Sequence, residues 1–292
     1  MRDGLSDGEK EISERFCTHL ERVSKLAISK EDEEAALEVV NNLGKFGRST
    51  AENRLEDATT IALSFLNLIG RTAAEKELEY TTLMVASNFG GIGIIAAEKE
   101  LERAATAAVS SLGEVGRTAA GKGIKNPTTT AVGSLGEIGC KTAEKGFVNA
   151  TEWAVESLHD IGEATVENGL EDATMYVVMC LRNVGKASSE NELKGAIIKA
   201  ISSLLVVGTL ATEKDFELVT SMVADFLGDL TQLNEEVVKT AIQNFDLTLR
   251  GQDRYGSLQK IMKLYKQKLE KLRAEKKNQD FNKSINPISP KS

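Results

Sequence analysis

The sequence predicts an all-α fold, an α-solenoid or α-α superhelix of about ten short helical repeats. The first observation is a period of 23 residues, marked by a large apolar residue at Leu43, Leu66, Phe89, Leu112, Leu135, Leu158, Leu181 and Leu204. The second is that an apolar residue follows three positions later in each unit, and glycine directly after it, from Gly47 to Gly208. Because a fixed period in this range is typical of stacked supersecondary units, the repeats should share one continuous core.

Each unit can be numbered from its large apolar residue as place one. Asp57 and Asn126 stand at place fifteen, and such residues favour helix starts. Gly123 and Gly146 stand at place twelve, where glycine ends a helix at little cost. We therefore expect two helices in each unit, one of about four turns that stops at the place-five glycine and one of one to two turns.

The chain should divide into four parts. Residues 1–42 are expected to hold the N-terminal helices and a capping repeat, and residues 43–250 the tandem repeats. Residues 251–277 are expected to form a basic amphipathic helix, and residues 278–292 a disordered tail. The apolar stripe of this C-terminal helix consists of Leu258, Ile261, Tyr265, Leu269 and Leu272.

Two places are open for that C-terminal helix. It can lay its stripe on the last repeat, since a solenoid needs a cover at its end. Alternatively, residues 255–277 can contact an anionic membrane as a peripheral amphipathic helix. We favour docking on the body.

Charge is divided unevenly along the chain. Residues 1–249 hold 24 Lys and Arg against 40 Asp and Glu, whereas residues 250–292 hold 12 against 4. An acidic body disfavours nucleic acid as the main partner. No run approaches the roughly 18 apolar residues of a membrane-spanning helix. The three widely spaced cysteines fit a reducing compartment, so we expect a cytoplasmic protein.

The column at place nineteen is the first candidate binding site. It contains Trp153, Tyr176, Met84 and Met222, and exposed Trp and Tyr side chains are favoured binding anchors. The column can line a groove for a partner helix, or it can fill gaps between successive helices, which is the commoner role of large apolar residues at helical spacing.

The column at place six is the second candidate. Arg48, Arg71, Arg117 and Lys186 occupy it, just after the glycine. A ladder of positive charges can hold acidic partners or phosphates. The alternative is that each cation pairs with a carboxylate on an adjacent unit, and such surface ion pairs are common and weak.

Catalysis and metal binding find no support in the sequence. The only histidines are His19 and His159, and neither has the partners that a metal site or an acid–base pair needs. The recurrent Gly residues lack the Lys-Ser/Thr that a phosphate-binding loop requires. We expect no catalytic residues, no metal and no cofactor.

The phrase A-V-x-S-L-G-E-I-G at Ala131–Gly139, repeated in related form at Ala154–Gly162, resembles HEAT-like repeats of the phycobilin-lyase type. The resemblance covers residues from about 20 to 250 and implies an α-solenoid. Because the unit of 23 residues is shorter than those repeats, it implies that one helix of each pair is truncated. Family members include scaffolds and adaptors as well as lyases, an iron hydroxylase and DNA glycosylases. The repeated His-Glu pairs of the hydroxylase type are missing here.

These observations predict a non-enzymatic scaffold or adaptor that binds a protein partner along an extended repeat surface. The alternative is binding of nucleic acid or an anionic surface through the place-six cations and the basic C-terminal helix. A continuous positive stripe on one face would favour the alternative.

Overall fold

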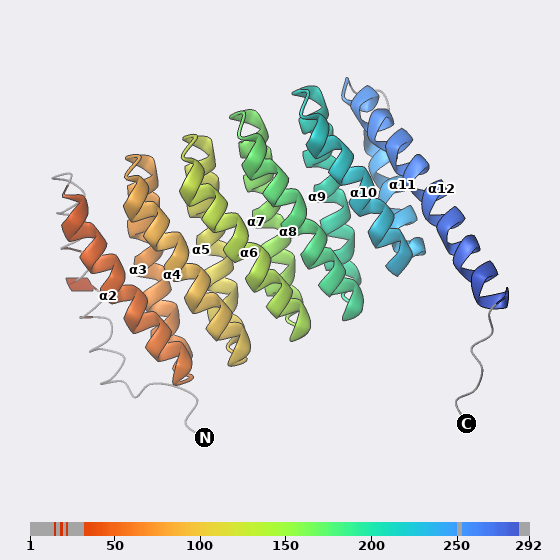
Figure 1. Ribbon diagram of the computed structural model, residues 1–292. Coiled ribbons are helices and arrows are strands. Elements are labelled where there is room, and N and C mark those ends of the chain that lie inside the picture. The colour runs from red at the N-terminus through yellow and green to blue at the C-terminus, as the bar shows by residue number, and fades with distance from the viewer. Residues whose placement is uncertain (1–14, 16–17, 20–21, 23–31, 250–252, 286–292) are drawn as a thin grey trace, which may run out of the picture.

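The computed structural model describes residues 15, 18–19, 22, 32–249 and 253–285. The predicted helix over residues 9–25 lies largely outside the described residues. Within them, regular secondary structure is entirely α-helical, and the chain is an elongated all-α solenoid (Figure 1). The helices are α2 (Glu33–Glu52), α3 (Glu56–Glu75), α4 (Glu79–Glu98), α5 (Glu102–Gly121), α6 (Lys125–Glu144), α7 (Val148–Glu167), α8 (Glu171–Glu190), α9 (Lys194–Glu213), α10 (Glu217–Leu233), α11 (Glu235–Leu249) and α12 (Tyr255–Ile285).

Each 23-residue unit forms a single helix, so the prediction of two helices per unit is wrong. From α2 to α9 every helix has 20 residues. The place-five glycine lies inside the helix. Asp57 and Asn126 do not cap a helix start, because each is the second residue of its helix. The N-cap itself is an apolar residue, such as Leu55 or Ile124.

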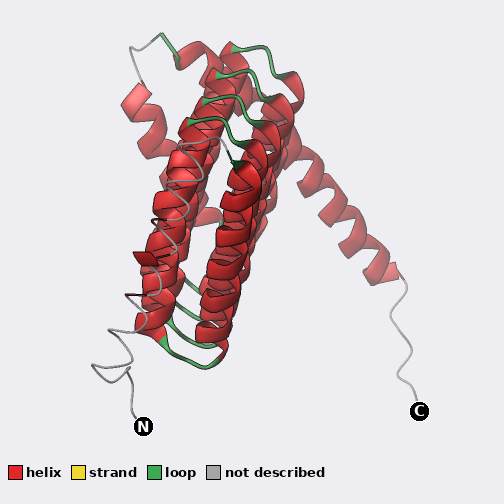
Figure 2. Ribbon diagram, turned by 90° about the vertical axis from the view of Figure 1, so that its left-hand side faces the viewer, coloured by secondary structure: helices red, strands yellow, loops and turns green. Residues whose placement is uncertain are grey.

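Successive helices alternate between two layers. Helices α2, α4, α6, α8 and α10 pack side by side in one layer, and α3, α5, α7, α9 and α11 form the other. We call them the even layer and the odd layer; Figure 2 shows them from the end of the stack. Since α3 begins at Glu56 and α5 at Glu102, a helix pair repeats every 46 residues. No helix of the pair is truncated, contrary to the expectation from the resemblance.

The place-five glycines are points of close packing between helices. A Cβ atom at Gly93 would lie 2.5 Å from Cδ1 of Ile138, two helices ahead, and 3.0 Å from Cβ of Ala108 on the next helix. Gly116 has the same relation to Ile161 and Ala131. From Gly47 to Gly185, each place-five glycine therefore leaves space for a branched side chain from its own layer and for an alanine or valine from the other layer; we call this space the glycine notch.

The turns between helices follow one hydrogen-bonding scheme. In the turn after α5, Gly123 N donates to Ala120 O at 2.9 Å and Ile124 N donates to Ala119 O at 2.9 Å. This is the Schellman motif, which needs a positive φ at its central residue. Gly123 supplies it with φ +72°, as the sequence predicted, but Glu192 and four other non-glycine residues must also adopt it.

Carboxylates from neighbouring repeats cap the N-termini of helices. The N-caps Leu78 and Leu101 make no side-chain cap hydrogen bond. Instead, Glu33 Oε1 accepts a hydrogen bond from Thr81 N at 3.1 Å, and Glu56 Oε1 accepts one from Arg103 N at 2.8 Å. Each glutamate begins a helix and caps the next helix of its own layer, which satisfies a backbone donor that would otherwise lack a partner.

Helices α4 and α9 are long and apolar enough to cross a membrane by length and composition alone. In the structure, 61% of the apolar window of α4 and 72% of that of α9 are buried inside the stack. Both helices have neighbours in both layers, so their apolar side chains supply the core of the solenoid.

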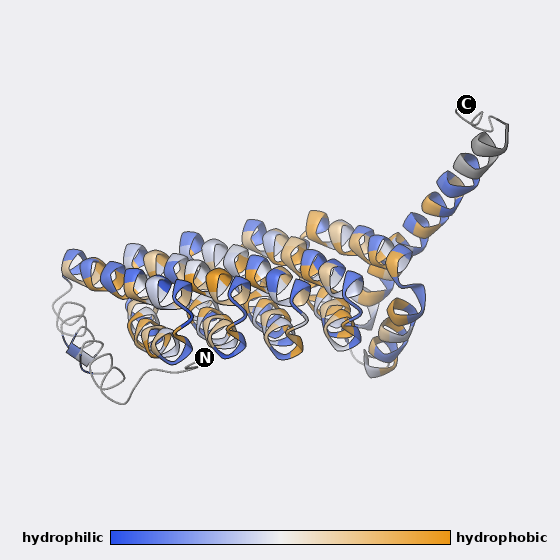
Figure 3. Cartoon of the chain, turned by 90° about the horizontal axis from the view of Figure 1, so that it is seen from below, coloured by the Kyte–Doolittle hydropathy of each residue, from blue (hydrophilic) through white to orange (hydrophobic). Residues whose placement is uncertain are grey.

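Helix α12 packs on the last repeats. Leu258, Ile261 and Tyr265 are buried, and a Cβ atom at Gly208 would lie 3.1 Å from Cδ1 of Ile261. The docking that we favoured from the sequence is therefore the arrangement in the structure. The helix continues to Ile285, past residue 277 where we expected it to end, and residues 286–292 lie outside the described residues. Beyond the docked stripe it extends away from the stack (Figure 3).

Replacing Gly93 by Ala tests the glycine notch. We expect Gly93→Ala to lower the free energy of unfolding by about 1–3 kcal/mol, because overpacking outweighs the better helix propensity of alanine. Gly121→Ala is the matched control, since nothing lies within 4 Å of a Cβ there and the substitution should be neutral or stabilising. Urea denaturation of both variants decides, and equal stabilisation by the two would refute the notch.

Relieving backbone strain at one turn should stabilise the chain. Glu192 has φ +59°, which costs an L-residue about 1 kcal/mol. We expect Glu192→Gly to raise the free energy of unfolding by roughly that amount, and Gly146→Ala at the equivalent turn to lower it. Thermal melts of the two variants should shift in opposite directions.

The cover at the C-terminal end can be tested at Ile261. Ile261→Ala should destabilise the chain by about 2–5 kcal/mol, because the side chain is fully buried against α9 and α10. Lys263→Ala on the exposed side of the same helix is the control. If both variants melt like the parent chain, α12 does not stabilise the solenoid.

Candidate partner-binding surfaces

The alternation of layers divides the place-nineteen column between two opposite surfaces. Met84 on α4, Tyr176 on α8 and Met222 on α10 lie on the even layer, whereas Trp153 on α7 lies on the odd layer. The structure therefore does not bring Trp153 and Tyr176 together in one groove. Trp153 has 49% of its surface exposed and Tyr176 has 36%, so both are partly open to solvent.

The place-six cations are divided in the same way. Arg48 and Lys186 belong to even-layer helices, and Arg71 and Arg117 to odd-layer helices. Three of them have polar partners. Arg48 donates to Asn88 Oδ1 at 2.6 Å, Arg71 lies 3.4 Å from Glu114 Oε2 two helices ahead, and Lys186 lies 3.8 Å from Glu190. They do not form one continuous positive stripe.

A trough lies on the solvent-facing surface of the even layer, between α6 and α8, with a volume of about 570 Å³. Small residues of α6 form its floor, and apolar residues of α8 form its wall. The lining residues are Thr129, Thr130, Gly133, Ser134, Asp172, Met175, Tyr176 and Met179. We call it the even-face trough.

Glycine at position 133 gives the trough its shape. A Cβ atom there would lie 2.8 Å from the Tyr176 hydroxyl, so the ring rests over the α6 backbone. Partial burial raises the pKa of Tyr176, and Cys180 and Glu137 nearby act in the same direction, so the hydroxyl stays protonated and can donate a hydrogen bond. Met179, 43% exposed, continues the apolar wall.

A second hollow lies on the odd layer, above α5, with a volume of about 630 Å³. Trp153 of α7 stands at one side and Thr60 of α3 at the other. Between them lie Glu102, Arg103, Thr106, Ala107 and Ser110 of α5, and Asn149 stands beside Trp153 on α7. Most of these side chains are short, and the indole of Trp153 is the aromatic side chain of the lining. We call this the odd-face trough.

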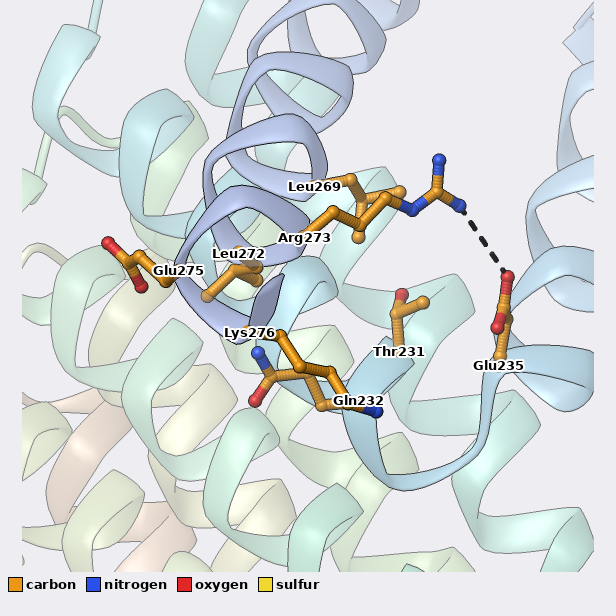
Figure 4. Close-up of a pocket in the computed structure, with 8 residues that line it drawn as sticks. All are labelled: Thr231, Gln232, Glu235, Leu269, Leu272, Arg273, Glu275 and Lys276. Carbon is orange, nitrogen blue, oxygen red and sulfur yellow. Dashed lines mark ion pairs between the residues drawn. The ribbon is translucent and has the colours of Figure 1, made fainter. Parts of the chain in front are cut away.

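A third hollow lies at the C-terminal end, between α12 and the end of α10, with a volume of about 710 Å³ (Figure 4). Its lining is mostly polar. Arg273 Nη2 lies 3.8 Å from Glu235 Oε1 across the opening, and Leu269 and Leu272 line it from α12. The hollow marks the place where α12 leaves the stack.

The described residues hold no group of three or more His, Cys, Asp or Glu side chains that could bind a metal ion. Burial raises the pKa of Cys140 to about 11 and that of Cys180 to about 12, so both stay as unreactive thiols at neutral pH. His159 lies 3.8 Å from Glu163 on the solvent side of α7.

Sequence reasoning missed Met175 and Met179. Met179 stands four positions after Met175 and three positions after Tyr176, and these are the spacings that place side chains on one helix face. The same spacing around Trp153 points to Glu152 and Glu156. This helical spacing could therefore be seen in the sequence. It indicates a binding surface only when the residues of the even layer and those of the odd layer are compared separately.

Comparisons with known proteins support the architecture alone. No family model matches the chain, and no curated protein matches it. A solved structure described as a circular tandem repeat protein with novel repeat topology and enhanced subunit contact surfaces is similar, with a TM-score of 0.51 and 14% identity. The match covers 96% of this chain and 76% of that chain. At this identity the likeness shows a shared helical-repeat fold.

Proposed function

We propose that the chain is a non-enzymatic, HEAT-like scaffold that binds a protein partner on the outer surface of its repeats. The even-face trough carries the proposal. Tyr176, Met175 and Met179 stand in a row on α8 beside a floor of small residues, and these apolar side chains remain partly exposed.

An amphipathic helix is the partner segment that suits this trough. Helix-in-groove recognition uses a row of apolar anchors at helical spacing, and methionine side chains adapt to varied partners. Leu218 on α10 and Tyr80 on α4 lie on the same layer and are 56% and 68% exposed, so further anchors could be met along the stack. The 46-residue spacing of helix pairs falls in the range of HEAT and armadillo repeats, about 40–47 residues.

Binding of nucleic acid or an anionic surface is the second candidate. Its support is α12, where Lys266, Lys271, Arg273, Lys276 and Lys277 are exposed on a helix that leaves the stack. The place-six cations add little to it, because they are divided between two layers and mostly paired.

Substitution in the trough tests the scaffold proposal. We expect Tyr176→Ser combined with Met179→Glu to abolish capture of the partner proteins that the parent chain retains from extract, with an unchanged melting temperature. Leu247→Glu on α11 is the matched control, since Leu247 is also a highly exposed apolar residue but lies on the odd layer.

The captured proteins should be identified for the parent chain and both variants side by side. If the trough variant keeps the same bound proteins as the control, the even-face trough is not the binding surface. Gly133→Ala gives a second check, because it displaces the Tyr176 ring without removing it.

A further inference from the structure

Helix α7 departs from the odd-layer pattern on its solvent-facing side. At place eighteen, α3 and α5 carry Thr60 and Thr106, and α7 carries Glu152. At place twenty-two the other odd-layer helices from α3 to α9 have serine, and α7 has Glu156. At place six α3 and α5 have arginine, and α7 has Glu163. The fold is the same in all these helices, so packing does not require these acids.

The acids on α7 are unfavourable for the helix itself. Glu152, Glu156 and Asp160 are spaced four residues apart, as are Glu163 and Glu167. Like charges at this spacing destabilise a helix. Helix α7 contains no Lys or Arg to offset them. Lys199 of α9 pairs with Glu152 at 2.9 Å and with Glu156, and this leaves Asp160 and Glu167 exposed toward solvent.

The acidic row begins beside the odd-face trough. Trp153 is next to Glu152 in the sequence, and its half-exposed indole forms one side of the trough. On α5, Arg103 Nη1 lies 3.3 Å from Asp57 Oδ1, and this ion pair offsets part of its positive charge. Trp153 thus bounds the trough on one side, and a line of carboxylates runs from it along α7.

We propose that the odd-face trough and α7 dock a cationic segment of another protein. Lysine or arginine side chains of the segment lie along Glu156, Asp160 and Glu163. One residue of the segment packs on the face of Trp153, where a cation or an apolar group is favourable. Complementary charge selects the partner, since carboxylates in a row repel phosphates and acidic segments.

This surface is on the opposite layer from the even-face trough, and the two can therefore be tested separately. Trp153 is the only tryptophan in the chain, so its fluorescence reports on this site alone. The probe is a tryptophan-free amphipathic helical peptide of lysine and leucine. The control probe has glutamate in place of every lysine.

The site variant combines Glu152→Thr, Glu156→Ser and Glu163→Arg, which are residues that α3 and α5 already carry at the same places. It should fold normally. The matched control, Glu171→Lys with Glu190→Lys on α8, changes the net charge of the chain by the same amount on the even layer. The dissociation constant should rise roughly tenfold in the site variant and change little in the control.

Three results would overturn the proposal. One is equal weakening in both variants, which would mean that the acidic body attracts the peptide as a whole. The second is binding, measured by calorimetry, that leaves the Trp153 fluorescence unchanged. The third is salt-sensitive self-association of the chain that the site variant abolishes, because the occupant would then be the basic α12 of a second copy. Binding of the lysine peptide alone, weakened by salt and by the site variant, supports it.

Discussion

Contact between a mid-helix glycine and a branched side chain two helices ahead determines the structure of the solenoid. Glycine inside a helix costs about 1 kcal/mol relative to alanine, so its recurrence in every unit needs a compensating gain. The gain comes from the close approach of neighbouring helices. With no Cβ at Gly139 or Gly162, Val184 and Val207 enter the helix surface and alanine or valine from the other layer meets them there. The spacing within a layer and the contact between layers are thus set at one place.

The fold class could be predicted from the sequence because the period, the apolar places and the turn glycines all repeat. The number of helices per unit could not. Local propensity treats a glycine such as Gly116 as a helix terminator, whereas tertiary packing makes it an interior residue. Residues such as Asn126 favour a cap by themselves, but the N-cap is the apolar Ile124, two residues earlier, and the helix starts at Lys125.

The candidate surfaces were predictable in part. A column of equivalent residues drew attention to Trp153 and Tyr176, but it left open whether they line a groove or fill gaps between helices; in the structure both are partly exposed. The column could not show that they face opposite ways, since an alignment of units carries no information about layers. Helix α12 shows the other limit: its apolar stripe ends near Leu272, so the pattern gave no reason to extend the helix to Ile285.

The placement of one helix per unit has a consequence for how such a chain can change in length. Gain or loss of a single 23-residue unit preserves the period, yet it moves every later helix into the other layer and reverses its direction. Side chains that had gathered on one side of the molecule would then be presented on the other. Only an even number of units leaves both surfaces intact, so parity, and not length, is the quantity that duplication must conserve.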